Sequence, residues 1–129
     1  MFTFHKTERL CSQKLIEDLY RTGKRFTAFP ITVHWKIIKS APTQSPAQVL
    51  IVAPKRRLRH AVDRNRVKRI MRESYRLQKH RLYSTLEATN QKLIISLSYS
   101  HHEIYEFQSI YRKIEKAIDK IISQIGETQ

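Results

Sequence analysis

The 129-residue chain has one cysteine, two glycines and four prolines. A single cysteine cannot form a disulfide within the chain, which excludes a disulfide-stapled secreted scaffold and favours the reducing cytoplasm. The longest apolar runs, residues 49–53 and 93–95, are far shorter than the roughly 20 residues needed to cross a bilayer. We therefore expect one cytoplasmic domain over residues 1–129, with an ordered core at about 8–125 and no membrane partner.

Acidic residues are also scarce. The chain has 11 Asp and Glu against 25 Lys and Arg, which gives a formal net charge of +14 and an isoelectric point near 10.3. Residues 55–81 hold twelve basic and two acidic side chains, so this segment alone supplies +10 of the +14. A small domain with this much clustered positive charge is typical of proteins that bind a polyanion.

Hydrophobic periodicity predicts the elements of the first half of the chain. Residues 12–22 predict a helix, with Ser12 as its N-cap and Gly23 as its stop. Apolar and polar residues alternate over 26–38, which predicts one strand with Pro30 at an edge or bulge. Residues 40–46 predict a loop, and 48–53 a second strand that is more fully buried.

In the second half, residues 63–81 predict a helix with Asp63 as its N-cap, and residues 92–98 predict a third strand. The sequence from Ser100 to Glu103 matches a capping box, so we expect the last helix to start there and to end at Gly126. The order is helix, strands, helix, strand, helix, which predicts a single-domain α+β sandwich around a mostly antiparallel sheet.

The helix predicted at 63–81 has two different faces. An apolar stripe on one side can pack on a sheet, and comprises Val67, Ile70, Met71, Ser74 and Leu77. The opposite side carries one amide and a row of cations: Asn65, Arg69, Arg72 and Arg76, with Lys68 and Lys79 beside them. Glu73 is the only acid inside this helix, so repulsion between the cations is largely uncompensated within it. A polyanionic ligand explains such a face better than solvation alone.

The sequence of residues 64–73, RNRVKRIMRE, preceded by His60-Ala61-Val62, resembles the Arg-Asn-Arg signature of the bacterial ribonuclease P protein subunit. The order of elements is also similar to that family over roughly residues 8–120. The resemblance implies an α/β sandwich with a left-handed βαβ crossover around the signature helix, a handedness that runs against the usual rule.

The resemblance also implies a function. The family forms a ribonucleoprotein that removes the 5′ leader of precursor tRNA, in which the catalytic RNA carries the Mg²⁺-dependent chemistry and the protein supplies no catalytic residue and no metal site. The implied contacts with the catalytic RNA are Arg64, Asn65, Arg66, Lys68, Arg69, Arg72 and Arg76, with additional phosphate contacts from Arg56, Arg57 and Arg59. The implied cleft for the single-stranded leader comprises Ile16, Tyr20, His34, Lys36 and Lys55.

Two other readings of the sequence stay open at this point. A ribosomal or other structural RNA-binding protein would have the same composition, and only the signature at 64–73 together with a leader cleft argues against it. A DNA-binding regulator would need a helix pair, whereas here predicted strands flank the basic helix, so we expect no DNA partner. The other candidate groups, the adjacent His101 and His102 and the lone Cys11, predict no catalytic or metal site.

Overall fold

The computed structural model describes residues 6–39 and 45–127. The chain forms, in order, the 3₁₀ helix η1 (Lys6–Glu8), α1 (Gln13–Thr22), β1 (Lys24–Ala28), β2 (Ile31–Ile38), β3 (Ala47–Val52), α2 (Ala61–Ala88), β4 (Lys92–Tyr99) and α3 (Phe107–Glu127). The α+β class predicted from the sequence is confirmed. The predicted helix at 12–22 and strands at 48–53 and 92–98 lie within one residue of the observed bounds, whereas most of the loop predicted at 40–46 lies outside the described residues.

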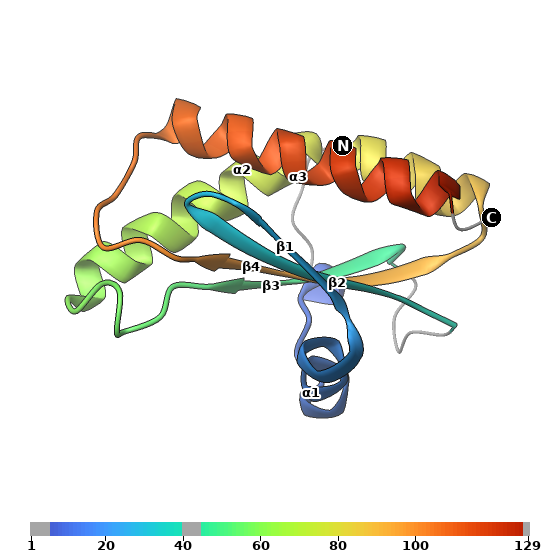
Figure 1. The fold of residues 1–129 in the computed structure, drawn as a ribbon, viewed down its shortest axis with the longest axis horizontal. Helices are drawn as coiled ribbons and strands as arrows, with labels where there is room; N and C mark the ends of the chain where they lie inside the picture. Colours follow the sequence, from blue (N-terminus) through green and yellow to red (C-terminus); the bar gives the residue numbers. More distant parts are fainter. Residues whose placement is uncertain (1–5, 40–44, 128–129) are drawn as a thin grey trace.

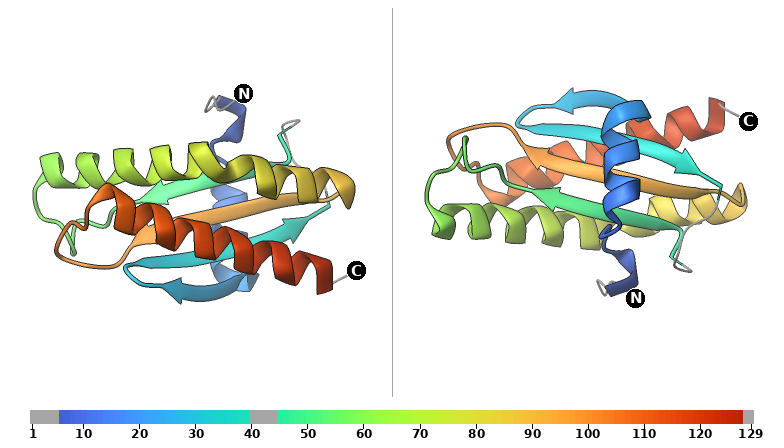
Figure 2. Two further views of the ribbon diagram at one scale, coloured as in Figure 1. Left: turned by 90° about the horizontal axis from the view of Figure 1, so that it is seen from above. Right: turned by 90° about the horizontal axis from the view of Figure 1, so that it is seen from below.

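The four strands form one open, mixed sheet in the order β1-β2-β4-β3. β1 pairs with β2 and β2 with β4 in antiparallel fashion, whereas β3 and β4 are parallel neighbours joined through α2. α2 and α3 cover one face of the sheet and α1 lies on the other (Figure 1). In the view from the helix side, β3 and β4 both point to the left and α2 passes in front of the sheet (Figure 2, left). β4 lies below β3 in this view. This crossover is left-handed, as the sequence resemblance implied.

The main core lies between the sheet and the pair α2 and α3. Alternate residues of the strands point into it, including Val33 and Trp35 of β2 and Ile95 of β4, and all three side chains are buried. The stripe predicted for the basic helix is present, with Val67 and Met71 fully buried. In the described ranges, no helix is long and apolar enough to span a membrane.

The single strand predicted at 26–38 is wrong, because the chain turns at Phe29 and Pro30 and folds back as a hairpin. β1 and β2 pair from Lys24 with Trp35 to Ala28 with Ile31. Phe29 and Pro30 are therefore the two residues of the turn. The Phe29–Pro30 peptide bond is cis. The apolar alternation continues across the turn, so the pattern alone did not reveal it.

The basic helix is longer than predicted and begins earlier. α2 starts at Ala61, so its N-cap is His60 and the predicted cap Asp63 lies in the first turn instead. His60 makes no side-chain capping bond, but the Arg64 side chain donates to the carbonyls of Leu58 and Arg59 at 3.0 and 2.8 Å. The helix continues to Ala88, and Asn90 adopts a positive φ of 53° in the turn that follows.

The capping box predicted at 100–103 is also wrong, since α3 begins only at Phe107. Instead, the backbone after β4 is bonded to the hydroxyl of Tyr99, which donates to the Glu103 carbonyl at 2.7 Å and accepts from the Tyr105 amide at 3.0 Å. These bonds hold residues 100–106 as a loop around the end of β4, which competes with helix formation there. At the other end, α3 runs to Glu127, so Gly126 does not stop it.

Lys79, predicted beside the cationic row, is buried instead. Its ammonium group donates to a carboxylate oxygen of Glu8 at 2.5 Å, and the hydroxyl of Tyr83 donates to the same oxygen at 2.6 Å. The side chains of Lys79 and Glu8 are only 6% and 4% exposed. This pair attaches η1 to α2 across 71 residues of sequence. A buried ion pair contributes little net stability, but removing one partner leaves a charge that the interior cannot solvate.

We therefore predict that Lys79→Met lowers the free energy of unfolding by about 3–5 kcal/mol, measured by urea denaturation. The double variant Glu8→Gln with Lys79→Met removes both charges and keeps an acceptor for Tyr83, so it should cost less than Lys79→Met alone. A double variant that costs as much as the two single variants added together would show that the two charges do not interact.

Candidate RNA interface

The cations of the signature helix form an exposed row that starts at one end of the molecule. We call residues 55–59, together with the cationic side chains of residues 64–72, the basic surface. Residues 55–57 form a turn just after β3, and α2 follows, so the two groups are adjacent at the same end (Figure 1). Arg66 and Arg69 are exposed, and Lys68 and Arg72 are half-buried. Within the described residues, no acidic side chain pairs with any of these four.

Two residues of the predicted RNA-binding set have partners within the chain. Arg64 donates to two loop carbonyls, as described above, and so helps to fix the turn before α2. Arg76 forms an ion pair and a hydrogen bond with Glu73, which lowers the pKa of that carboxyl. The charge of Arg76 is therefore partly compensated, and the part of the row without an acidic partner ends at Arg72.

α1 is fixed on the opposite face of the sheet by its ends and by a small apolar cluster. Ser12 caps it by accepting from the Leu15 amide at 3.3 Å. At the other end, a Cβ on Gly23 would lie 2.4 Å from the carbonyl oxygen of Leu19, so only glycine allows the chain to pass this close. Ile16 packs partly buried against the cluster of Leu10, Leu19 and Ile94. Ile16 therefore seats the helix as well as lying in the predicted leader cleft.

The structure brings two other predicted leader residues into direct contact. The rings of Tyr20 on α1 and His34 on β2 meet edge to face with centroids 4.7 Å apart. The Tyr20 hydroxyl also shares a 2.6 Å hydrogen bond with Ser96 of β4, the residue opposite His34 in the sheet. Tyr20 is nevertheless 44% exposed, so part of this residue is open to solvent. We call Ile16, Tyr20, His34 and Ser96 the α1–sheet junction.

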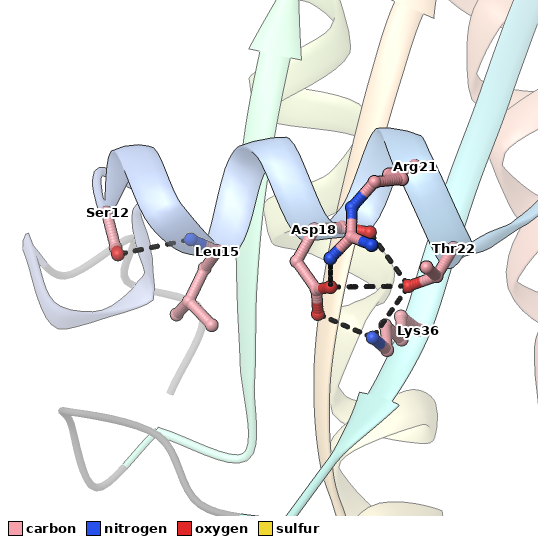
Figure 3. A network of polar contacts seen from close by, with 6 residues as sticks. All are labelled: Ser12, Leu15, Asp18, Arg21, Thr22 and Lys36. Atoms are coloured by element: carbon pink, nitrogen blue, oxygen red, sulfur yellow. Dashed lines mark hydrogen bonds and ion pairs between the residues drawn. The ribbon is translucent and has the colours of Figure 1, made fainter.

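Lys36 is near this junction but is engaged within the chain (Figure 3). Its ammonium group lies 2.5 Å from the Asp18 carboxylate and 2.7 Å from the Thr22 hydroxyl, and Arg21 pairs with the same carboxylate. The hydrogen bond from Lys36 is the main cause of the lowered pKa of Asp18. Lys55, the other predicted phosphate partner, is exposed in the turn after β3. That turn lies at the end of the sheet, whereas α1 crosses its middle (Figure 2, right).

A small pocket at the edge of β3 lies between the two predicted contact regions. It is lined by Arg72 of the basic surface and by Leu50 from the sheet face under α1. The remaining lining residues are Arg9, Leu10 and Cys11 of the N-terminal segment and Val49 and Ile51 of β3. The basic surface and the α1 side of the sheet are therefore continuous around this edge.

Sequence reasoning missed Ser96 and Asp18. In β4, the apolar side chains of Leu93, Ile95 and Leu97 point into the core, so the period of two places Ser96 on the opposite face. That alternation could have identified Ser96. Nothing in the sequence could have paired Asp18 with Lys36, because this contact depends on where α1 crosses the sheet.

His34 lies in a setting that disfavours its charged form. Its Nδ1 atom is buried without a hydrogen-bond partner, and Arg25 lies opposite it in the β1–β2 pairing. Burial first, and the positive charge of Arg25 second, lower the pKa of His34 below its ordinary value of 6.5.

Because the unfolded chain retains the ordinary pKa, protonation of His34 favours unfolding. We predict that the free energy of unfolding falls as the pH drops below about 6.5 towards the lower pKa of the folded state. The His34→Gln variant should lose less stability than the unmodified chain between pH 8 and pH 5, by urea denaturation. An equal loss in both proteins would contradict the assignment, because the remaining histidines are common to both.

The sequence is similar to known proteins of one family. The family model described as Ribonuclease P matches residues 4–122. The ribonuclease P protein component of Porphyromonas gingivalis is 32% identical over 124 residues, which cover 96% of this chain and 90% of that protein. That of Chlorobium phaeobacteroides is 37% identical over 84 residues, 64% of this chain and 58% of that protein.

Two solved structures share the fold. The RNase P protein from Thermotoga maritima superposes with a TM-score of 0.67 at 18% identity, covering 88% of this chain and 96% of that one. The Staphylococcus aureus RNase P protein gives 0.66 at 18% identity, covering 88% and 94%. The matched family model, the curated relatives and the shared fold agree with the resemblance of residues 64–73, and the chain belongs to the ribonuclease P protein family.

Proposed function

We propose that this chain binds the catalytic RNA of ribonuclease P through the basic surface and the unpaired 5′ leader of precursor tRNA through the α1–sheet junction. As a member of its family, the chain is a protein component of an endoribonuclease. In this proposal the RNA performs the hydrolysis that releases the leader, in the cytoplasm, and the protein holds the two RNAs together. No side chain of the protein enters the bond-breaking step.

The observation that carries the proposal is the row of cations on α2 without acidic partners. Arg66, Lys68, Arg69 and Arg72 lie on consecutive turns of one rigid helix, and no acid of the described residues neutralises them. Phosphates of a folded RNA would supply the missing negative charge and release counterions on binding. Guanidinium groups suit this role, because their fork of donors matches two phosphate oxygens. Arg56, Arg57 and Arg59 extend the same surface into the preceding loop.

The α1–sheet junction has the chemistry to hold unpaired bases. Tyr20 is a partly exposed aromatic residue whose ring is kept in position by the hydrogen bond to Ser96 and by the edge-to-face contact with His34. A lowered pKa favours the neutral imidazole of His34, which presents a flat ring rather than a cation. Stacking on such rings does not depend on base identity, and this suits a leader whose sequence differs between precursors.

The Mg²⁺ that the resemblance implies has no set of ligands on this chain in the described ranges. There, no three His, Cys, Asp or Glu side chains gather closely enough to hold a metal ion. In the proposal the ion is held by phosphates of the catalytic RNA. The contribution of the protein is to lower the repulsion between two polyanions, so that less Mg²⁺ is needed to keep them together.

Reconstitution tests the proposal directly. The purified chain is mixed with the ribonuclease P RNA of its own source and a precursor tRNA at low Mg²⁺, and cleavage at the mature 5′ end is followed. We expect cleavage only when both the protein and the RNA are present. If the protein binds the RNA tightly but cleavage never requires it, the chain is a structural RNA-binding protein and the proposal is wrong.

We also predict that Arg69→Ala or Arg72→Ala weakens binding to the catalytic RNA and makes that binding less salt-dependent. Each lost phosphate contact should reduce the slope of log affinity against log salt by about 1, measured by titration at several salt concentrations. Lys116→Ala removes an exposed cation from α3 and serves as the control, with an unchanged slope expected. Equal slopes for all three variants would remove Arg69 and Arg72 from the contact surface.

A further inference from the structure

Three aromatic rings that the proposed function does not use gather at one end of the sheet. Phe29, from the turn between β1 and β2, meets His101 edge to face with centroids 5.1 Å apart, and Tyr105 at 6.1 Å. His101 and Tyr105 are stacked at 5.4 Å with 25° between their planes. Phe29 is 49% exposed and Tyr105 36%. These three residues are called the aromatic cluster below.

The aromatic cluster is joined to the α1–sheet junction through a row of small polar residues. On the face of the sheet that carries His34 and Ser96, the next pair towards the turn is Thr32 with Ser98. The Thr32 hydroxyl shares a 2.6 Å hydrogen bond with Ser100, the residue before His101. His34 lies three residues, or about 10 Å along the strand, from Ile31, the first residue of β2. The aromatic cluster begins just beyond that end of the strand.

This part of the sheet is not covered by α1. The helix crosses only the middle of the sheet, and the strands extend beyond it towards the end that carries the turn at Phe29 (Figure 2, right). The loop from β3 to α2, which holds residues 55–59, and the loop from β4 to α3 lie at the same end in both views (Figure 2). The aromatic cluster, with Phe29 and Tyr105 exposed, therefore lies at the same end of the molecule as the loop part of the basic surface and the start of α2.

Exposed rings beside cations are suited to single-stranded nucleic acid, because unpaired bases stack on the rings while cations neutralise the backbone. A duplex keeps its bases stacked internally and offers no free base faces. We infer that the aromatic cluster binds a second unpaired base of the 5′ leader, separate from the base held at the α1–sheet junction. The inference rests on the proposed function and extends it. The leader would then contact two ring sites, separated by the row of Thr32 and Ser98.

Precursors with leaders of different lengths test this inference in the reconstituted holoenzyme. The series runs from mature tRNA to a leader of about ten nucleotides, within the site sizes of ~4–16 nucleotides that single-strand-binding folds cover. The quantity measured is the apparent Kd, taken as the holoenzyme concentration that half-saturates single-turnover cleavage, with competition binding for the mature tRNA. The variants are Phe29→Leu, which keeps apolar bulk without a ring, Phe29→Tyr, which keeps the ring, and Tyr20→Leu at the junction.

For the unmodified chain we expect affinity to rise in two steps as the leader lengthens, one for each ring site. Phe29→Leu should abolish one step, with a loss of about tenfold, and leave the other unchanged. Phe29→Tyr should retain both steps. Tyr20→Leu should abolish the step that Phe29→Leu leaves. Tyr105→Leu should behave as Phe29→Leu does, since its side chain belongs to the same cluster while its backbone bond to Tyr99 is kept.

A loss for Phe29→Leu that is the same at every leader length overturns the inference, because it would place the cluster against the catalytic RNA or in the folded core. No loss at any length also overturns it. These results leave the proposed function standing whenever the unmodified chain still prefers precursors to mature tRNA. If the unmodified chain shows no such preference and does not support cleavage, the proposed function and the inference fail together.

A photo-crosslinkable base in the leader gives a measurement that does not depend on any variant folding. Scanned through the leader of the unmodified holoenzyme, it should label residues 29 or 101–105 from some positions and residues 20 or 34 from others. Crosslinks confined to the second group at every position would refute the second ring site. Thermal unfolding of each variant shows whether a loss of affinity comes from the missing ring or from an unfolded protein.

Discussion

The parallel pairing of β3 with β4 is the constraint on which the positions of both candidate surfaces depend. Parallel neighbours cannot be joined by a hairpin, so the chain has to return along the whole sheet between them. α2 makes this return with 28 residues, about 42 Å of helix, and it must begin at the end where β3 finishes. The first turns of α2 therefore emerge beside residues 55–59, and the cations of both segments act as one surface.

The two long helices share one face of the sheet (Figure 1). α2 and α3 bury the apolar sides of the strands, and on the other face, among the described residues, the one α-helix is the ten-residue α1, packed together with Leu10. That face can carry polar side chains such as Thr32, Ser96 and Ser98, which the core could not accept without partners. The position of α1 is set by its two ends, by the apolar cluster around Leu19, and by two polar contacts, Tyr20 with Ser96 and Asp18 with Lys36.

The features predicted correctly from the sequence are those with a repeated pattern. The stripe through Val67 and Met71 and the buried strand at 48–53 follow from periodicity, and residues 64–73 indicated the family. The errors arise where one side-chain contact, rather than a repeated pattern, decides the local structure. The Tyr99 hydroxyl bonds to the backbone of the segment where the capping box was predicted. Lys79 is buried in an ion pair with Glu8, seventy-one positions away, and so does not belong to the exposed cationic row. Within the candidate site, the sequence indicated Tyr20 and His34, but only the fold reveals that they touch.

The segment around η1 also affects how the sheet meets other copies of the chain. β3 is an edge strand, and a free edge can pair with a strand from another molecule. Here the Leu10 amide donates to the Val49 carbonyl at 2.9 Å, and Arg9 bridges to the same residue, so part of that edge is already occupied. The other edge, β1, is only five residues long and begins with two cations, Lys24 and Arg25. Both edges are thus protected from strand addition, one by the chain's own N-terminal segment and the other by shortness and charge.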